Sequence, residues 1–284
     1  GSPSVEPPNL LKKGQETLLA GGIAGLSVDV ALYPLDTLKT RLQSQQGFQK
    51  AGGFRGVYKG LSAVMVGSMP TSALFFLSYE KTKTLLLPYV DMKYAPAVHM
   101  CAASVGEVVA CIFRVPMEIA KQRKQTYIGT NRKSNITILA DAYKSEGVTR
   151  GLYRGFFSTV ARDLPFSFIE MPVWEYLKNL VSTPLDVNAL CGSIAGGFAA
   201  ALTTPLDVVK TRIMLATDGT AASSLKVTTV FVSIVKDRGF GGLFAGLTPR
   251  VTAFTAGGFV FFGAYDYAKV VGGTTPDWQT AYHY

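Results

Sequence analysis

The chain has 284 residues and a mass of 30.5 kDa, with 48% hydrophobic and only 17% charged residues. This composition favours a polytopic membrane protein, and the length excludes an extra soluble domain beside the predicted spans. Its net charge of +9 suits an anionic lipid surface or nucleic acid. Because the basic residues gather at predicted helix ends rather than in one aromatic-rich patch, we expect a membrane partner and no nucleic acid.

Six apolar segments follow one another along the chain, and each contains polar or charged residues. They cover 16–42, 61–87, 95–125, 155–181, 188–214 and 247–271. Few of them hold about 20 uninterrupted apolar residues, so hydropathy alone undercounts them. The polar positions recur at helical spacing, which gives each helix one wet face and one lipid-facing stripe. We therefore expect an all-α membrane protein with six transmembrane helices around a central cavity.

The odd-numbered segments share a charged motif in which a proline is followed by an acid, a lysine and a second basic residue at fixed spacing. The three copies start at Pro34, Pro116 and Pro205, roughly 80 to 90 residues apart. The prolines are expected to kink these helices. The spacing predicts a polar lead-in, three repeats of two spanning helices and a tail, over 1–15, 16–92, 93–185, 186–272 and 273–284.

The even-numbered segments end in a second triplicate, an aromatic residue followed by an acid and a lysine. Its copies contain Tyr79, Glu80 and Lys83, then Trp174, Glu175 and Lys178, then Tyr265, Asp266 and Lys269. Acid and base three residues apart can pair within one helix, which is worth only a few tenths of a kcal/mol. A single copy is equally typical of a solvated helix end, but matching sets at both ends favour two rings of charge.

A third repeated element places a glycine just before each even-numbered segment, at Gly60, Gly155 and Gly246. Free backbone amides at a helix start favour phosphate groups. The alternative is that the aromatic residue two positions earlier merely anchors the chain at the membrane interface. The stretch before Gly60 is shorter than the other two connections, so a full helix there is doubtful.

The triplicated motifs resemble the signature of the mitochondrial carrier family, from about residue 16 to 271. The resemblance implies a ring on the matrix side that pairs Asp36 with Lys121, Glu118 with Lys210, and Asp207 with Lys39. It also implies glutamine braces at Gln43 and Gln125, whereas Met214 occupies the third position, so at most two braces are expected. The second triplicate would form a cytoplasmic ring with tyrosine braces, where Trp174 departs from the pattern.

The same resemblance implies a short matrix helix in each of the three repeats. It also implies cardiolipin at Gly60, Gly155 and Gly246, and at Gly129 as the start of one such helix. It further implies substrate contacts at Phe75, at Arg162 with Asp163, and at Phe254. A guanidinium holds an α-carboxylate and a carboxylate holds an α-ammonium. The other intramembrane polar residues are candidates by default, and they are Asp29, Glu107, Arg114 and Glu170.

Local sequences around Glu107, Arg162 and Phe254 are similar to the S-adenosylmethionine carrier branch of that family. This resemblance implies an alternating-access antiporter of the mitochondrial inner membrane that exchanges S-adenosylmethionine for S-adenosylhomocysteine. The alternative substrate is another amino acid or a nucleotide-like cation, and a proton-leak or structural role stays open. An enzyme such as a methyltransferase would need a glycine-rich loop after a strand, which is absent here. We expect no cofactor, no metal site at the three cysteines, and a monomer.

Overall fold

The structure, a computed structural model, describes residues 10–129, 133–180, 186–216 and 224–271, and within these ranges the fold is all-helical. The long helices are α1 (Leu10–Gln43), α2 (Leu61–Leu86), α3 (Ala95–Gln125), α5 (Phe156–Leu180), α6 (Asp186–Leu202) and α9 (Leu247–Val271). The shorter helices of the described ranges are α4 (Asn135–Gly147), α7 (Thr204–Leu215) and α8 (Val227–Arg238). The predicted segments match these helices within a few residues, except that one predicted segment is divided into α6 and α7.

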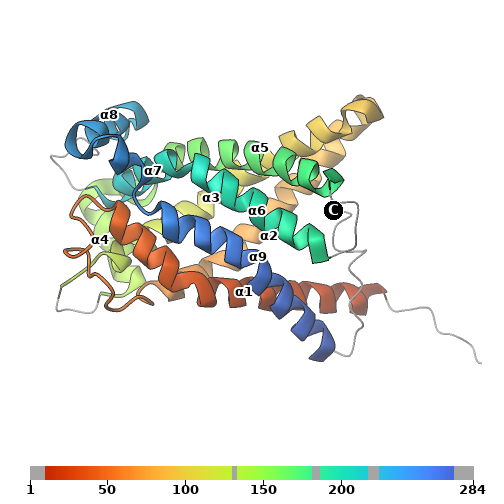
Figure 1. The fold of residues 1–284 in the computed structure, drawn as a ribbon, viewed down its shortest axis with the longest axis horizontal. Coiled ribbons are helices and arrows are strands. Elements are labelled where there is room, and N and C mark those ends of the chain that lie inside the picture. The colour runs from red at the N-terminus through yellow and green to blue at the C-terminus, as the bar shows by residue number, and fades with distance from the viewer. Residues whose placement is uncertain (1–9, 130–132, 181–185, 217–223, 272–284) are drawn as a thin grey trace, which may run out of the picture.

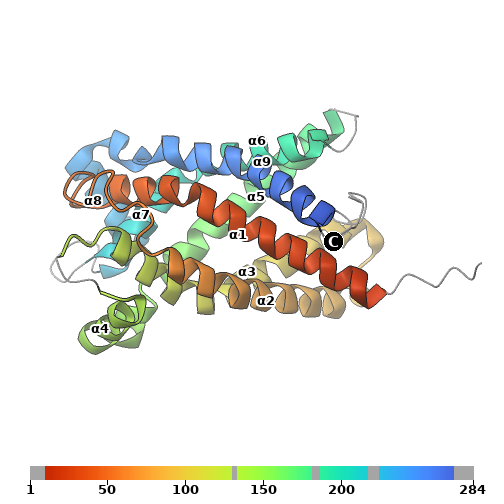
Figure 2. The same ribbon diagram turned by 90° about the horizontal axis from the view of Figure 1, so that it is seen from below.

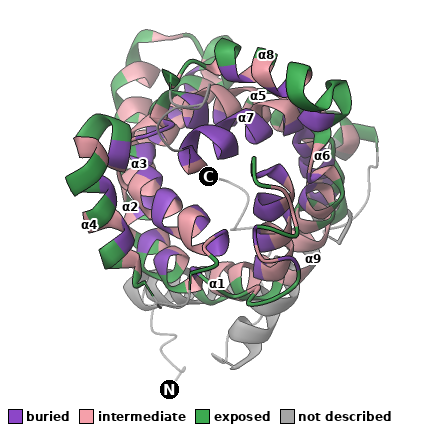
Figure 3. Ribbon diagram, turned by 90° about the vertical axis from the view of Figure 1, so that its left-hand side faces the viewer, coloured by how far each residue is buried: buried purple, intermediate pink, exposed green. Residues whose placement is uncertain are grey.

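The long helices form a closed ring around a central axis. Around the ring α1 packs beside α2, α2 beside α3, α3 beside α5, α5 beside α6, α6 beside α9, and α9 beside α1. Seen end-on, the helices surround the axis, and α7 crosses the near end inside them (Figure 3). The shorter helices α4 and α8 also lie at this same end, on the left in Figures 1 and 2.

The three motif prolines act differently on their helices. Pro34 and Pro116 lie inside α1 and α3, which continue through them. In the third repeat the helix breaks at Thr203, and α7 turns away from α6 by 64° with Pro205 in its first turn. A proline lacks the amide hydrogen that a continuous helix needs and clashes with the preceding turn. The structure therefore shows a full helix break at the motif proline of the third repeat, whereas α1 and α3 continue through theirs.

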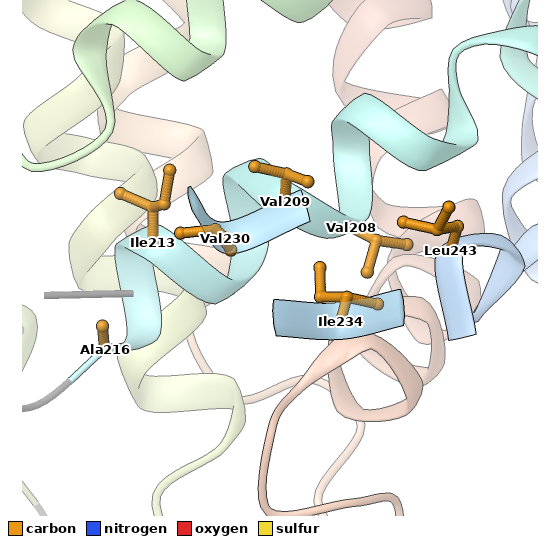
Figure 4. Close-up of a cluster of buried hydrophobic side chains, with 7 residues drawn as sticks. All are labelled: Val208, Val209, Ile213, Ala216, Val230, Ile234 and Leu243. Carbon is orange, nitrogen blue, oxygen red and sulfur yellow. The ribbon is translucent and has the colours of Figure 1, made fainter. Parts of the chain in front are cut away.

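The connections that follow the motif also differ between repeats. Residues 44–60 form turns without a helix, as the short first connection predicted. Arg41 organises these turns, since its guanidinium donates to the carbonyl oxygens of Gly53 at 2.7 Å, Arg55 at 2.6 Å and Gly56 at 3.2 Å. In the third repeat an apolar core joins α7 to α8 and to the turn Phe240–Phe244 instead (Figure 4). The expectation of a short helix in every repeat is wrong for the first.

Polar side chains are buried at the α4/α8 end, and large apolar side chains are exposed along the outside. Lys210 and Asp207 have no exposed surface, whereas Met69, Phe76 and Leu77 are 76%, 61% and 61% exposed. Exposed apolar surface on this scale marks a contact with lipid or protein. Of the described helices, Leu61–Tyr89 and Met92–Gln125 are long and apolar enough to cross a membrane, and the bent pair Leu190–Leu202 and Thr204–Leu215 passes the same test jointly.

Candidate functional site

Three ion pairs between repeats close the end of the bundle where α7 crosses, and we call them the charged ring. Lys121 Nζ lies 2.9 Å from Asp36, Lys210 Nζ lies 2.7 Å from Glu118, and Lys39 Nζ lies 3.0 Å from Asp207. The structure therefore brings together the three pairs that the family resemblance implies. The pairing within one helix is weaker, because Lys39 Nζ is 3.9 Å from Asp36 but 3.0 Å from Asp207.

Glutamine amides brace all three pairs of the charged ring. Gln125 donates to Asp36 at 3.0 Å, and Gln43 donates to Asp207 at 2.8 Å. Met214 is buried in an apolar cluster in the third repeat and supplies no amide. Gln122, one turn beyond Glu118 on α3, donates to Glu118 at 3.0 Å instead. The prediction of two braces at most is therefore wrong, because an amide from a different position contacts the remaining pair.

Asp207 binds more cations than the other two acids of the ring. Arg162 and Arg250 both contact its Oδ1 atom, at 3.0 Å and 2.7 Å, while Lys39 contacts Oδ2. Its side chain has no exposed surface, compared with 30% for Asp36. Such burial of a carboxylate requires close cationic partners. Arg162 of α5 and Arg250 of α9 therefore compensate the Asp207 carboxylate together with Lys39.

A chain of ion pairs connects Asp207 of the charged ring to the candidate substrate residues. Arg162 pairs with Asp163 and with Asp207. Asp163 is also 3.1 Å from Arg114, which pairs with Glu107. Ligand atoms of Glu107, Cys111 and Asp163 lie within 4.8 Å of one another, a grouping that could hold a metal ion. Arg114 already supplies positive charge to both of these carboxylates, which makes the group an ion-pair network as it stands.

A cavity of about 420 Å³ lies directly above the charged ring. It is lined by residues of α1, α2, α3, α5 and α9, among them Asp29, Arg114, Arg162, Arg250 and Phe254. Asp36 and Glu118 of the ring also reach the cavity, whereas Asp207 does not. Within the described part of the chain, Asp29 has no ion-pair partner. A ligand in this cavity meets three arginines and a carboxylate, that of Asp29, without an ion-pair partner in the described part of the chain.

Phe254 lines the cavity, whereas Phe75 and Glu170 are not among its lining residues. Phe75 stacks on Tyr79, with ring centres 6.1 Å apart, and packs on Gly106 of α3. Phe254 contacts Phe166, with ring centres 4.9 Å apart. Glu170 lies beside Gly196, where an added Cβ atom would be 3.2 Å from its Oε1 atom. Only Phe254 of these three lines the cavity itself, and Glu170 lies next to it across Gly196.

At the far end of the bundle, the structure describes the side chains of the first copy of the second triplicate, together with Trp174 of the second copy. Lys83 Nζ lies 2.8 Å from Glu80 of the same helix, and the Glu80 side chain is 51% exposed. The Tyr79 hydroxyl hydrogen-bonds to His99 Nδ1 at 2.7 Å. The other five residues predicted there have side chains outside the described part, and they are Glu175, Lys178, Tyr265, Asp266 and Lys269.

The three glycines before the even-numbered segments share a backbone conformation. Gly60, Gly155 and Gly246 have φ values of 91°, 82° and 74°, which favour glycine. A Cβ atom on Gly60 would lie 3.0 Å from the Lys121 carbonyl oxygen. Close packing against the helices of the charged ring is therefore a second reason for glycine at these sites. The expectation that Gly129 starts a helix is wrong, because α4 begins at Asn135 after the cap Ser134.

Sequence reasoning missed three residues that the structure brings into the site. Gln122 lies four residues after Glu118, a spacing that could have indicated its contact. Phe166 lies four residues after Arg162, on the same face of α5. His99 contacts Tyr79 from a neighbouring helix, and nothing in the sequence indicated that contact.

The chain is similar in sequence to known mitochondrial carriers. The model of the family described as mitochondrial carrier protein matches residues 12–90, 93–185 and 183–274. The chain is 53% identical over 280 residues to the S-adenosylmethionine mitochondrial carrier protein homolog of Drosophila melanogaster. The aligned region covers 96% of this chain and 98% of that protein. It is 50% identical to the mitochondrial S-adenosylmethionine carrier proteins of Mus musculus and Danio rerio, over 89% and 88% of this chain and 93% and 94% of those proteins.

Proposed function

We propose that this chain, which belongs to the mitochondrial carrier family, imports S-adenosylmethionine into the matrix in exchange for S-adenosylhomocysteine. It is a multi-pass transporter of the mitochondrial inner membrane and not an enzyme. Six spans, two in each repeat, fit the closed ring of long helices. The relatives named as S-adenosylmethionine carriers support the substrate over nearly the whole chain.

The observation that carries this proposal is the combination of charges around the cavity. Arg162 lines the cavity beside Asp163, so the two offer a cation for an α-carboxylate and an anion for an α-ammonium. Asp29 adds negative charge for a substrate that is positive overall, and Phe254 adds an aromatic face for a heterocycle. S-adenosylmethionine has each of these features, and it has no phosphate that would need further basic residues.

The charged ring acts as the matrix gate of an alternating-access cycle. In the state described here the ring is closed and the cavity lies above it, so substrate enters from the cytoplasmic side. Buried ion pairs contribute little net energy, because desolvation offsets their attraction. A ring of this kind lets differential binding of the substrate shift the equilibrium between states. The second triplicate, which contains Glu80 and Lys83, forms the opposite gate in the other state.

The network above Asp207 supplies a route from substrate to gate. A substrate carboxylate that binds Arg162 competes with Asp163 and Asp207 for the same guanidinium. Binding therefore changes the charge balance at the third pair of the ring. Arg250 keeps Asp207 paired during this exchange, which lowers the cost of separating Asp207 from Lys39.

Gly60, Gly155 and Gly246 lie at the helix starts where cardiolipin would bind. The cavity and the charged ring both lie within a single chain, so a monomer suffices for transport.

Exchange in proteoliposomes tests the substrate directly. The purified protein is reconstituted into vesicles loaded with S-adenosylhomocysteine, S-adenosylmethionine, ornithine, ATP or buffer alone, and uptake of labelled S-adenosylmethionine is followed. We expect uptake only with the two adenosyl compounds inside. Equal uptake with ornithine or ATP would assign the chain to an amino-acid or nucleotide carrier, and uptake without any internal substrate would contradict an exchange mechanism.

Asp163→Asn tests the proposed α-ammonium site. The variant removes the negative charge but keeps the shape of the side chain, and we expect the uptake rate to fall at least tenfold, equivalent to about 1.4 kcal/mol. Asp141→Asn is the matched control, because Asp141 is an exposed carboxylate on α4 that pairs only on the surface with Lys133, at 2.9 Å. Uptake by Asp163→Asn at the control rate would exclude this residue from substrate binding.

A further inference from the structure

Glu170 is a carboxylate that the ion-pair network leaves uncompensated. Among the residues that the structure describes it has neither a hydrogen-bond nor an ion-pair partner, although its side chain is half-buried on α5. The neighbouring carboxylates differ, because Glu107 and Asp163 both contact Arg114. A charge left unpaired at membrane depth is costly and indicates a role with a cation.

Two aromatic rings lie beside this carboxylate. Phe166 is one turn before Glu170 on the same face of α5, and its ring centre is 4.9 Å from that of Phe254 on α9. Gly196 of α6 connects the group, because a Cβ atom there would be 3.2 Å from Glu170 Oε1 and 3.7 Å from the Phe254 ring. The absence of a side chain at Gly196 thus leaves the carboxylate and the ring next to one another.

The group continues the line of the proposed amino-acid site. Arg162, Phe166 and Glu170 follow at intervals of four residues, so each lies about 6 Å further along α5 than the one before. A short aliphatic chain separates the α-carbon of S-adenosylmethionine from its sulfur. When Arg162 and Asp163 hold the amino-acid end, the sulfur reaches the next turn of the helix, where Phe166 and Phe254 lie.

We propose that Phe166, Phe254 and Glu170 form a cation subsite that holds the sulfonium centre of the substrate, an assignment that rests on the proposed function. Aromatic faces attract a desolvated cation, and a nearby carboxylate adds to that attraction. Arg250 also lies over the Phe254 ring, 5.7 Å from its centre, but its charge is paired with Asp207. The Glu170 carboxylate is the group without such a partner.

The subsite distinguishes the two exchanged compounds. S-adenosylmethionine carries a positive sulfonium, whereas S-adenosylhomocysteine carries a neutral thioether of nearly the same shape. Loss of an aromatic ring or of the Glu170 charge therefore weakens binding of the first compound and leaves binding of the second nearly unchanged. A residue that only packs the helices together would change both affinities to the same extent.

The test measures the dissociation constants of both compounds by ligand-dependent thermal stabilisation of the purified protein. For Phe166→Leu and Glu170→Gln we expect the constant for S-adenosylmethionine to rise about 5- to 30-fold, and that for S-adenosylhomocysteine to change less than about twofold. Phe166→Tyr keeps the ring and should keep the preference. Phe157→Leu, which alters an 82% exposed phenylalanine of the same helix, is the matched control.

The outcomes separate this inference from the proposed function. Equal weakening of both compounds, or no change in either, overturns the cation subsite while the carrier function stands. A wild-type protein that binds neither compound overturns the carrier function and the subsite together.

Discussion

The two ends of the helix ring hold acid and lysine at the same spacing, and the pairs that the structure describes differ between them. At the charged ring each lysine lies closest to an acid of another repeat, with Lys210 fully buried beside Glu118. At the far end Lys83 pairs with Glu80 of its own helix, and half of the Glu80 side chain is exposed. The three-residue spacing permits both arrangements. Packing of α7 across one end supplies Asp207 and Lys210, and so one partner in two of the three pairs of the charged ring.

Asp207→Asn should cause the largest loss of stability at the charged ring. The variant leaves Lys39, Arg162 and Arg250 around a neutral amide, and removal of one partner from a buried ion pair costs about 3–5 kcal/mol. We expect the largest loss of thermal stability among single changes in the ring, measured by unfolding of the purified protein in detergent.

Asp207→Glu keeps the charge and should recover most of that stability, which separates loss of charge from loss of packing. Asp141→Asn on the surface serves as the control. Wild-type stability in Asp207→Asn would mean that the three cations around Asp207 contribute nothing to the closed ring.

Gln122→Leu should produce an intermediate effect at the same end. It removes the amide that donates to Glu118, and a hydrogen bond of this kind is worth about 1 kcal/mol net. The Gln122 Oε1 atom is buried without a partner, so its removal offsets part of the loss. We expect stability to fall by about 1 kcal/mol and exchange to become faster, because the pair of Glu118 and Lys210 opens more easily.

Gln45→Leu, at an exposed glutamine in the first connection, is the control for that experiment. Gln43→Leu should cost more than Gln122→Leu, because Gln43 donates to Asp207 and also accepts from Thr211 at 2.7 Å. The reverse order of the two losses would show that Gln122 braces the ring more strongly than Gln43.

The difference between the ends also explains what sequence could predict. Helix positions and the missing first connecting helix followed from local patterns, whereas the three ring pairs followed from the resemblance to the carrier family. Contacts that break the threefold symmetry did not follow, because they depend on distances between helices. Arg162 was expected to face substrate with Asp163, yet it also binds Asp207 of α7. The break at Thr203 was equally hidden, since the same Leu-Asp-x-x-Lys-Thr-Arg sequence follows Pro34 and Pro205, yet α1 continues through Pro34 and Pro205 lies in the first turn after the break.

Glu80→Gln should have the smallest effect on stability of these variants. An exposed pair within one helix contributes about 0.2–0.5 kcal/mol, so the melting temperature should stay close to that of wild type. Exchange should nevertheless slow, because the proposed opposite gate needs the Glu80 carboxylate when the cytoplasmic end closes. Stability and transport therefore separate at this end, whereas Asp207→Asn changes both. A loss of stability as large as that of Asp207→Asn would mean that Glu80 already holds helices together in the state described here.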